Sequence, residues 1–346
     1  DGYVTCYFNA MEGLVKLFQV NREREYLALA ERMADFYKAF DVLPISHTHG
    51  MLCNQYALLL LYEQTGKTTY LQRVEHRWNA MLDSGYANPA GGVQERSGDK
   101  MIYDEGCAES DWLRVNLKLF EITKNKRYLD MAERLLWNHY LANQHSSGGF
   151  GHRNMMNDNK GIFGFANYVA EATWCCDFHN TLGFQLLKPL LVTANPQELY
   201  INFPLSYKAS LDINESTWNI ASGIEAGKMN DIVLQQTLQL YNNKQKQTRL
   251  AIRMPGWATG ITVTNASGKA IAFEPGPGYW RSKKIIRAGE IIKVSYHGKI
   301  IVEDRHCRPI TITSKEQYIG EVVLKYGPRL LMIKDSKSIP SLTLGI

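Results

Sequence analysis

The sequence lacks the features that mark membrane-spanning and nucleic-acid-binding proteins. Its 346 residues contain no apolar run near twenty residues, and the 39 basic and 34 acidic side chains are spread along the chain without a Lys/Arg block. Neither a membrane span nor a surface that grips a phosphate backbone is therefore expected. With 45% apolar and 21% charged residues, the composition is that of a globular protein. We expect two to three domains and no nucleic-acid or membrane partner.

Cysteine is scarce as well. The chain has six cysteines, which are Cys6, Cys53, Cys107, Cys175, Cys176 and Cys307. They are too few and too unevenly spaced for a disulfide scaffold in a chain of this length. The adjacent residues Cys175 and Cys176 can hardly bridge each other without strain. Reduced thiols or metal ligands are therefore the favoured interpretations.

The opening residues carry no secretion signal. Residues 1–20 show an amphipathic pattern where a signal peptide would be uniformly apolar. Because this pattern is already under way at residue 1, we expect further helices ahead of it. The sequence carries no signal for the compartment or for the oligomeric state.

A sequence motif that recurs three times predicts paired helices. In each copy an aromatic residue lies eight positions before a tyrosine, and a short polar turn separates two segments of helical periodicity. The tyrosines are Tyr26, Tyr70 and Tyr128, and each is followed five residues later by a glutamate, at Glu31, Glu75 and Glu133. The recurrence of these glutamates at one phase of the repeat favours a shared structural role. Each copy is predicted to be a helix, a tight turn and a second helix.

The hairpins and the residues after them predict an α+β multidomain fold. Hairpins whose apolar stripes cannot be buried alone favour an (α/α)6-type toroid of paired helices, here without its N-terminal hairpins, completed by a lone inner helix near 176–193. After about residue 196 the period changes from 3.6 to 2, with turn clusters such as 242–243 and 275–278. Short strands at this spacing predict an antiparallel β-sandwich. We therefore expect a helical-toroid domain over 1–195 and a β-sandwich domain over 196–346.

Acidic and sulfur-bearing groups gather in two irregular stretches between the helices. Glu105 and Cys107 are two residues apart, so in an extended segment they point the same way. Together with the thiolates of Cys175 and Cys176 they would form a tetrahedral zinc site. The alternative is that the cysteines are buried and inert, with Glu105 acting as a cap or first-turn carboxylate of the following helix.

Glu95 and several histidines are candidates for the chemistry itself. A carboxylic acid on a loop over a helix-lined pocket can protonate a leaving oxygen, whereas the alternative for Glu95 is a solvated carboxylate paired with Arg96 or Lys100. His47 and His49 precede a predicted helix and are candidates to hold a sugar hydroxyl, or else to cap or pack. His152, in a glycine-rich loop, is a third candidate for substrate binding.

Taken together, these motifs resemble glycoside hydrolase family 127, the β-L-arabinofuranosidase group. The resemblance rests on Glu95, on Glu105-Gly-Cys107 ten residues later, on Cys175-Cys176, and on the phrase Arg-Met-Pro-Gly-Trp at 253–257. In the family the first interval is about sixteen residues and the cysteine pair is more usually followed by proline. This chain has Asp177-Phe-His179 there, so its pocket should differ in shape and its sugar need not be arabinofuranose.

The resemblance implies roles for individual residues. Glu105, Cys107 and Cys176 would bind Zn²⁺, Cys175 would be a zinc-bound nucleophile, and Glu95 would be the acid/base. His47 would contact the sugar. The implied activity is a retaining hydrolase that removes L-arabinofuranose or a related sugar from plant-type glycans, with an oligosaccharide or glycan as substrate.

Two other functions remain open at this point. The first is a catalytically inactive carbohydrate-binding protein of the same fold, which would bind oligosaccharides without turnover. The second is a zinc-independent hydrolase or lyase that acts on uronic sugars, in which substitution of the cysteines would change nothing.

Overall fold

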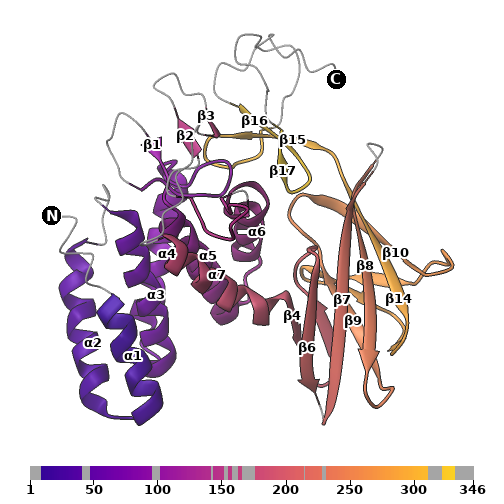
Figure 1. Ribbon diagram of the computed structural model, residues 1–346, viewed down its shortest axis with the longest axis horizontal. Coiled ribbons are helices and arrows are strands. Elements are labelled where there is room, and N and C mark those ends of the chain that lie inside the picture. The colour runs from indigo at the N-terminus through magenta and orange to yellow at the C-terminus, as the bar shows by residue number, and fades with distance from the viewer. Residues whose placement is uncertain are drawn as a thin grey trace.

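The computed structural model places helices and large sheets on opposite sides of the molecule (Figure 1). It describes residues 9–40, 47–95, 102–141, 143–151, 155–157, 163–165, 176–213, 215–227, 231–310 and 322–331. The helical side comes first along the chain, and α7 leads directly into the first strand of a large sheet. Of the helices in these ranges, none has both the length and the apolar character to cross a membrane.

The three predicted hairpins are confirmed. The helices are α1 (Asn9–Asn21), α2 (Arg24–Tyr37), α3 (Thr48–Thr65), α4 (Thr68–Asp83), α5 (Gly106–Thr123), α6 (Arg127–Leu135) and α7 (Cys176–Leu191). Two or three residues separate the members of each pair. The turn after α3 contains Gly66 in the left-handed conformation (φ 70°), which glycine adopts without steric cost. A π-helical segment, Leu136–Tyr140, extends α6.

The repeated tyrosines and glutamates join one hairpin to the next. The hydroxyl of Tyr70 donates to Glu31 at 3.2 Å, and the hydroxyl of Tyr128 donates to Glu75 at 2.7 Å. The third glutamate, Glu133, instead accepts from the guanidinium of Arg253, which comes from the sheets. The glutamates of the repeat are thus structural, as the recurrence predicts.

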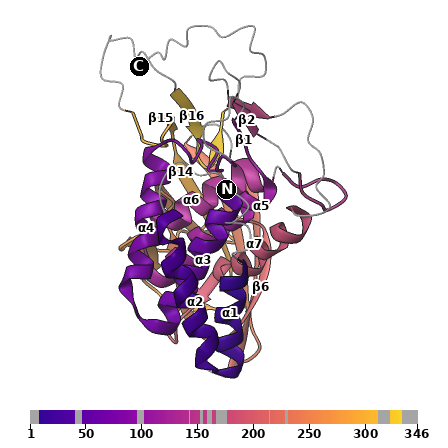
Figure 2. The ribbon, with the colours of Figure 1, turned by 90° about the vertical axis from the view of Figure 1, so that its left-hand side faces the viewer.

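Helices α3 and α5 form the interior of the described helical part. Nearly every residue of α5 and most of α3 are buried, whereas α2 and α4 bury one face only. Helix α5 packs between α3 and α7, and Figure 2 shows α1 to α4 in front of the strands. This alternation of buried and half-exposed helices is what a layer of inner and outer helices requires. The toroid itself stays a prediction.

Two large sheets share one apolar core. The strands of the first are β6 (Tyr207–Ile213), β7 (Ser216–Ala226), β8 (Ile232–Asn242), β10 (Ala258–Asn265) and β14 (Ile291–Gly298). Those of the second are β4 (Val192–Ala194), β5 (Glu198–Ile201), β9 (Gln247–Arg253), β11 (Phe273–Pro275), β12 (Tyr279–Ser282) and β13 (Ile286–Arg287). Buried side chains from both, such as Leu238 and Ile252, lie in one cluster. The pairing is antiparallel throughout the described strands except between β5 and β9, which run parallel and so depart from a purely antiparallel sandwich.

Two smaller sheets lie beside the helices. One contains β1 (Ile102–Tyr103), β2 (Met155–Asn157) and β3 (Phe163–Phe165), so it joins the two irregular stretches of the helical half. The other contains β15 (Ile300–Asp304), β16 (Val322–Tyr326) and β17 (Arg329–Leu330). Arg134 of α6 binds Glu303 of β15 through two hydrogen bonds of 2.8 Å, which ties this last sheet to the helices. The division into domains at residue 195 stays a prediction.

Candidate active site

The first turn of α5 holds a carboxylate and a thiol side by side. Glu105 is the residue before the helix, in extended conformation (φ −131°, ψ 138°), and its side chain makes no capping hydrogen bond. Instead Oε2 of Glu105 accepts from Sγ of Cys107 at 3.4 Å. Glu105 thus occupies the N-cap position of α5, as the alternative expected, while its carboxylate contacts the cysteine.

The thiol of Cys176 meets that of Cys107. Cys176 is the first residue of α7, and its Sγ lies 3.8 Å from Sγ of Cys107, with both side chains almost fully buried. Gly106 allows this approach, since a Cβ there would lie 2.6 Å from the carbonyl oxygen of Gly151 and 2.9 Å from Nδ2 of Asn180 on α7. Cys175 immediately precedes this helix and lies outside the described residues.

The described part of this cluster fits a zinc ion. Two thiolates at a Zn–S distance of about 2.3 Å in a tetrahedral site lie roughly 3.8 Å apart, and a carboxylate oxygen lies about 3.6 Å from each sulfur. The observed separations are 3.8 Å between the sulfurs of Cys107 and Cys176 and 3.4 Å from Glu105 to Cys107. The sulfur separation also far exceeds the roughly 2.05 Å of a disulfide bond. Glu105, Cys107 and Cys176 thus offer three donors with suitable spacing.

Glu95 is buried and faces His47. Oε1 of Glu95 is 3.5 Å from Nε2 of His47, and the Glu95 side chain is only 1% exposed. Its backbone carbonyl accepts from the amide of Thr48 at 2.9 Å, which fixes the loop to the start of α3. The donor atoms of His47, Glu95 and Glu105 all lie within 4.8 Å of one another. The alternative of a solvated Glu95 is therefore wrong.

His47 serves two neighbours at once. It is the N-cap of α3, and its Nδ1 accepts from the amide of Gly50 at 3.1 Å. In a neutral imidazole that accepts at Nδ1, the proton is on Nε2, the nitrogen that faces Glu95. For this residue, the role of helix cap is thus compatible with the contact to Glu95.

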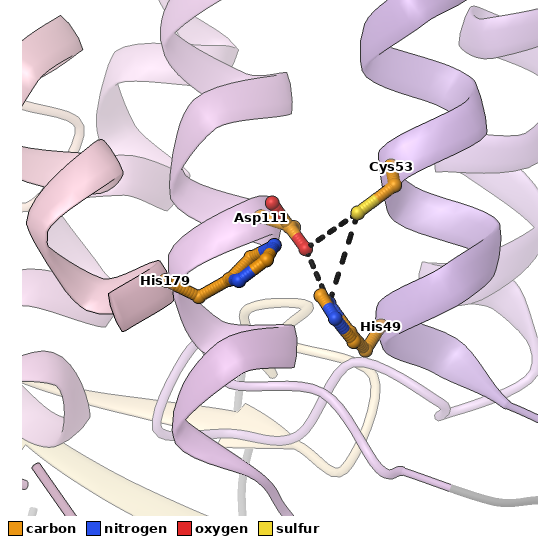
Figure 3. A group of neighbouring side chains, drawn as sticks. All are labelled: His49, Cys53, Asp111 and His179. Carbon is orange, nitrogen blue, oxygen red and sulfur yellow. Dashed lines mark hydrogen bonds and ion pairs between the residues drawn. The ribbon is translucent and has the colours of Figure 1, made fainter. Parts of the chain in front are cut away.

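His49 belongs to a second group of side chains (Figure 3). It does not precede the helix, as the sequence suggested, but lies in the first turn of α3. Its Nδ1 is 2.6 Å from Oδ2 of Asp111 on α5, and Sγ of Cys53 donates to the same oxygen at 3.1 Å. The ring of His179 on α7 packs edge-on against that of His49, with the centroids 4.4 Å apart. His152 lies outside the described residues.

A buried charged triad supports the loop that carries Glu95. His139 contacts Oδ2 of Asp104 through Nε2, and its Nδ1 lies 3.7 Å from Oε2 of Glu109. Oε1 of Glu109 accepts from the amide of Val93, two residues before Glu95. Burial alone would lower the pKa of His139, but the carboxylates of Glu109 and Asp104 outweigh it and raise that pKa to about 9. The imidazolium therefore sits between two carboxylates beneath the loop.

Sequence reasoning missed several of these polar groups. Asp111 lies one turn after Cys107 on α5, and Cys53 lies one turn after His49 on α3. His179, which the sequence does offer as a candidate like His152, lies nearly one turn after Cys176 on α7. Helical spacing of three or four residues from each candidate was the available signal. The triad gives no such signal, because Asp104 and His139 are far apart along the chain.

Part of the chain matches a family model. Residues 90–183 match the model described as the GH127 catalytic domain of β-L-arabinofuranosidases. This segment includes Glu95, the first turn of α5 and the start of α7. No curated protein matches the chain.

Solved structures share the fold over almost the whole chain. A GH127 β-arabinofuranosidase matches with a TM-score of 0.68 at 17% identity, over 93% of this chain and 55% of its own. A GH127 β-L-arabinofuranosidase from Geobacillus stearothermophilus T6 matches with a TM-score of 0.65 at 16% identity, over 92% of this chain and 57% of its own. A third structure, described as a glycoside hydrolase, matches with a TM-score of 0.65 at 14% identity, over 92% and 59%. The chain thus spans less than two thirds of the length of these structures.

The segment that matches the family model contains Glu105, Cys107 and Cys176, the residues that meet at the starts of α5 and α7. Residues 90–183 of this chain are thus similar to the catalytic domain of glycoside hydrolase family 127, and the fold of the chain is similar to that of GH127 structures.

Proposed function

We propose that the chain forms the active part of a retaining glycoside hydrolase that removes L-arabinofuranose or a related sugar from plant-type glycans. The observation that supports this most is the meeting of Glu105, Cys107 and Cys176, three residues of the matched segment, at separations suited to zinc. The two named neighbours are described as β-arabinofuranosidases, which supports a furanose substrate. The helices are proposed to belong to an (α/α)6-type toroid, over 1–195, followed by a β-sandwich over 196–346.

The proposed zinc site consists of Glu105, Cys107, Cys175 and Cys176. A bound zinc ion lowers the pKa of its thiol ligands, so that a cysteine is a thiolate at neutral pH. The buried surroundings of Cys107 and Cys176 exclude water from these ligands. Cys175, next to Cys176 in sequence, is the proposed nucleophile.

Glu95 is the proposed acid/base. The sulfur of Cys175 attacks the anomeric carbon while the bond to the leaving oxygen breaks, and the Glu95 carboxyl gives its proton to that oxygen. Water then attacks the anomeric carbon while the bond to the Cys175 sulfur breaks, so that Glu95 takes the proton of the water and Cys175 leaves as a thiolate. The sugar is released with retained configuration. His47 contributes by facing Glu95 at 3.5 Å with the nitrogen opposite its capping contact, which orients the carboxyl.

The experiment is turnover of aryl glycosides of L-arabinofuranose and related sugars, with zinc measured on the same sample. We expect Cys107→Ser to lose both zinc and turnover, because it removes a ligand whose sulfur contacts Cys176. Glu95→Gln should keep its zinc and lose about 10² to 10⁴ in rate, the usual contribution of acid–base catalysis. The matched control is Cys307→Ser, since this thiol donates to the carbonyl of Asn88 and belongs to neither cluster of candidate ligands.

Other results would contradict the proposal. Full turnover by a metal-free protein would reject the zinc site. Binding of plant oligosaccharides without product over long incubation would favour the inactive carbohydrate-binding function, and action on uronic sugars by the Cys107→Ser variant would favour the zinc-independent one.

A further inference from the structure

A second group of metal-ligating side chains lies along the same helices. His49 and Cys53 are four residues apart on α3, Asp111 is four residues after Cys107 on α5, and His179 is three residues after Cys176 on α7. Asp111 and His179 therefore lie about one helical turn after Cys107 and Cys176, on the same faces of α5 and α7. His49 and Cys53 share one face of α3. Three helices that are distant in sequence therefore contribute to one cluster, as Figure 3 shows.

The donor atoms of the cluster converge. One ligand atom from each of the four residues lies within 4.8 Å of all the others. Oδ2 of Asp111 is the centre, at 2.6 Å from Nδ1 of His49 and 3.1 Å from Sγ of Cys53, and the last two atoms are 3.8 Å apart. Cys53 and Asp111 are fully buried, whereas His49 and His179 are partly exposed and leave a way in.

The chemistry of the donors selects a class of ion. Two imidazoles, one thiol and one carboxylate are ligands of borderline softness, which suit Zn²⁺ and its neighbour Co²⁺, whereas Mg²⁺ and Ca²⁺ prefer oxygen alone. We propose that His49, Cys53, Asp111 and His179 form a second site for a divalent ion of the zinc class, separate from the site at Glu105 and Cys107. This proposal goes beyond the proposed function and does not depend on it.

The surroundings of Asp111 prepare it as a ligand. Its Oδ1 accepts from Nη1 of Arg114 at 2.8 Å, and Arg114 in turn binds Glu12 at 2.6 Å. One carboxylate oxygen is thus held by the guanidinium, which leaves the other directed at the cluster. Ligating carboxylates are commonly fixed by such a neighbour.

The thiol of Cys53 must lose its proton on binding. Sγ of Cys53 donates to Oδ2 of Asp111 at 3.1 Å, so the thiol proton lies between these two atoms, in the region where an ion would bind. A divalent ion would replace that proton.

The test is the number of zinc ions that remain bound after loading and desalting. We expect about two per chain for the unaltered protein, one for each four-ligand cluster. Cys53→Ser and His179→Ala should each retain about one, and Cys107→Ser should retain the other. His179 is partly exposed, so His179→Ala keeps the buried core even where Cys53→Ser does not fold. Cys307→Ser, the control for loss of a thiol, should retain both.

Cobalt substitution identifies which cluster is filled. The difference in absorption between the unaltered protein and Cys53→Ser should contain a sulfur-to-cobalt charge-transfer band, because only the Cys53 thiolate distinguishes them. The proposal is overturned if the unaltered protein and His179→Ala bind the same amount of zinc. If one zinc is lost in His179→Ala and none in Cys107→Ser, the second site stands and the zinc site of the proposed function fails. If the reverse holds, the proposed function stands and this inference fails.

Discussion

The two ring nitrogens of His47 make different contacts, so its role as a helix cap and its contact with Glu95 can be separated by substitution. Nδ1 accepts from the amide of Gly50 and Nε2 faces Glu95. Asparagine is also a strong N-cap residue, but it lacks a group that reaches as far as Nε2. The residue therefore tests whether a cap and a catalytic contact coincide.

We predict that His47→Asn keeps the free energy of unfolding and loses activity. His47→Ala should lose both, with about 1 kcal/mol of stability lost through the missing cap. Urea unfolding and turnover of an aryl arabinofuranoside, measured on both variants, check this prediction. If His47→Asn turns over substrate at the original rate, His47 is a cap and no more.

His139 predicts a loss of stability at alkaline pH. Its pKa is raised from 6.5 to about 9 by Glu109 and Asp104 against the effect of burial, so folding favours the protonated imidazole. A raised pKa gives stability that is fully present below pH 6.5 and is lost as the pH rises through 9.

Thermal unfolding between pH 6 and pH 10 measures this effect. The protein should lose on the order of 3 kcal/mol over that range through His139. His139→Gln should be less stable at pH 6 and should lack this step, because glutamine does not titrate. Parallel curves for the two proteins would show that the imidazole is not charged in the folded state.

At the scale of elements, the loop before β1 depends on a close approach to α5. A Cβ at Gly92 would lie 2.8 Å from Oε1 of Glu109 and 2.9 Å from Cδ2 of His139. Both of these side chains are fully buried, so neither can move aside easily. The position of Glu95, three residues later, is fixed through this contact.

Gly92→Ala should therefore displace the loop and destabilise the protein by about 1–3 kcal/mol. Turnover should fall as well, since Glu95 moves with the loop. The matched control is Gly223→Ala on β7, where a Cβ would meet nothing within 4 Å. Guanidinium unfolding and initial rates on both variants make the comparison. Unchanged stability and rate in Gly92→Ala would mean that the loop is held by other contacts.

The elements themselves were largely predictable from the sequence. The eight-residue spacing of aromatic and tyrosine gave every hairpin, because helix packing imposes the same contact, Tyr70 with Glu31 and Tyr128 with Glu75, on each copy. The parallel pairing of β5 with β9 was not predictable. Alternation reports which face of a strand is buried, and it carries no information about the direction of the neighbouring strand.

The candidate site was predictable in part, and motif spacing explains which part. Glu105 and Cys107 are two residues apart and Cys176 opens a helix, so short-range pattern found them. In the sequence, Asp111 and Cys53 are not distinguished from other residues of buried helices. Their proximity follows only from the packing of α3 against α5. Contacts between helices are set by packing, which a linear pattern does not contain.

At the scale of the whole molecule, one buried arginine joins the helices to the sheets. Arg253, at the end of β9, is 1% exposed and donates to Asp130 at 2.5 Å and to Glu133 at 2.6 Å, both on α6. Its Nε also donates to the carbonyl of Asn202. The third glutamate of the repeat thus binds a sheet, whereas the first two bind a tyrosine of the next hairpin.

Arg253→Met should destabilise the protein by about 3–5 kcal/mol, because it leaves the buried Glu133 without its partner. Adding Glu133→Leu should recover much of this loss, since it removes the unpaired carboxylate. Arg249→Met, an exposed arginine on the same strand, is the control. Calorimetry on the single and double variants measures the coupling. Additive losses would show that Arg253 and Glu133 do not depend on each other.

The central claim is that Glu105, Cys107 and Cys176, with Cys175, bind one zinc ion beside Glu95. The most direct test is a crystal of the zinc-loaded protein measured at the zinc absorption edge. The account predicts an anomalous peak within bonding distance of the sulfurs of Cys107 and Cys176 and of a Glu105 oxygen. Absence of a peak between these two sulfurs in crystals that contain zinc elsewhere, or a disulfide joining them, would contradict it.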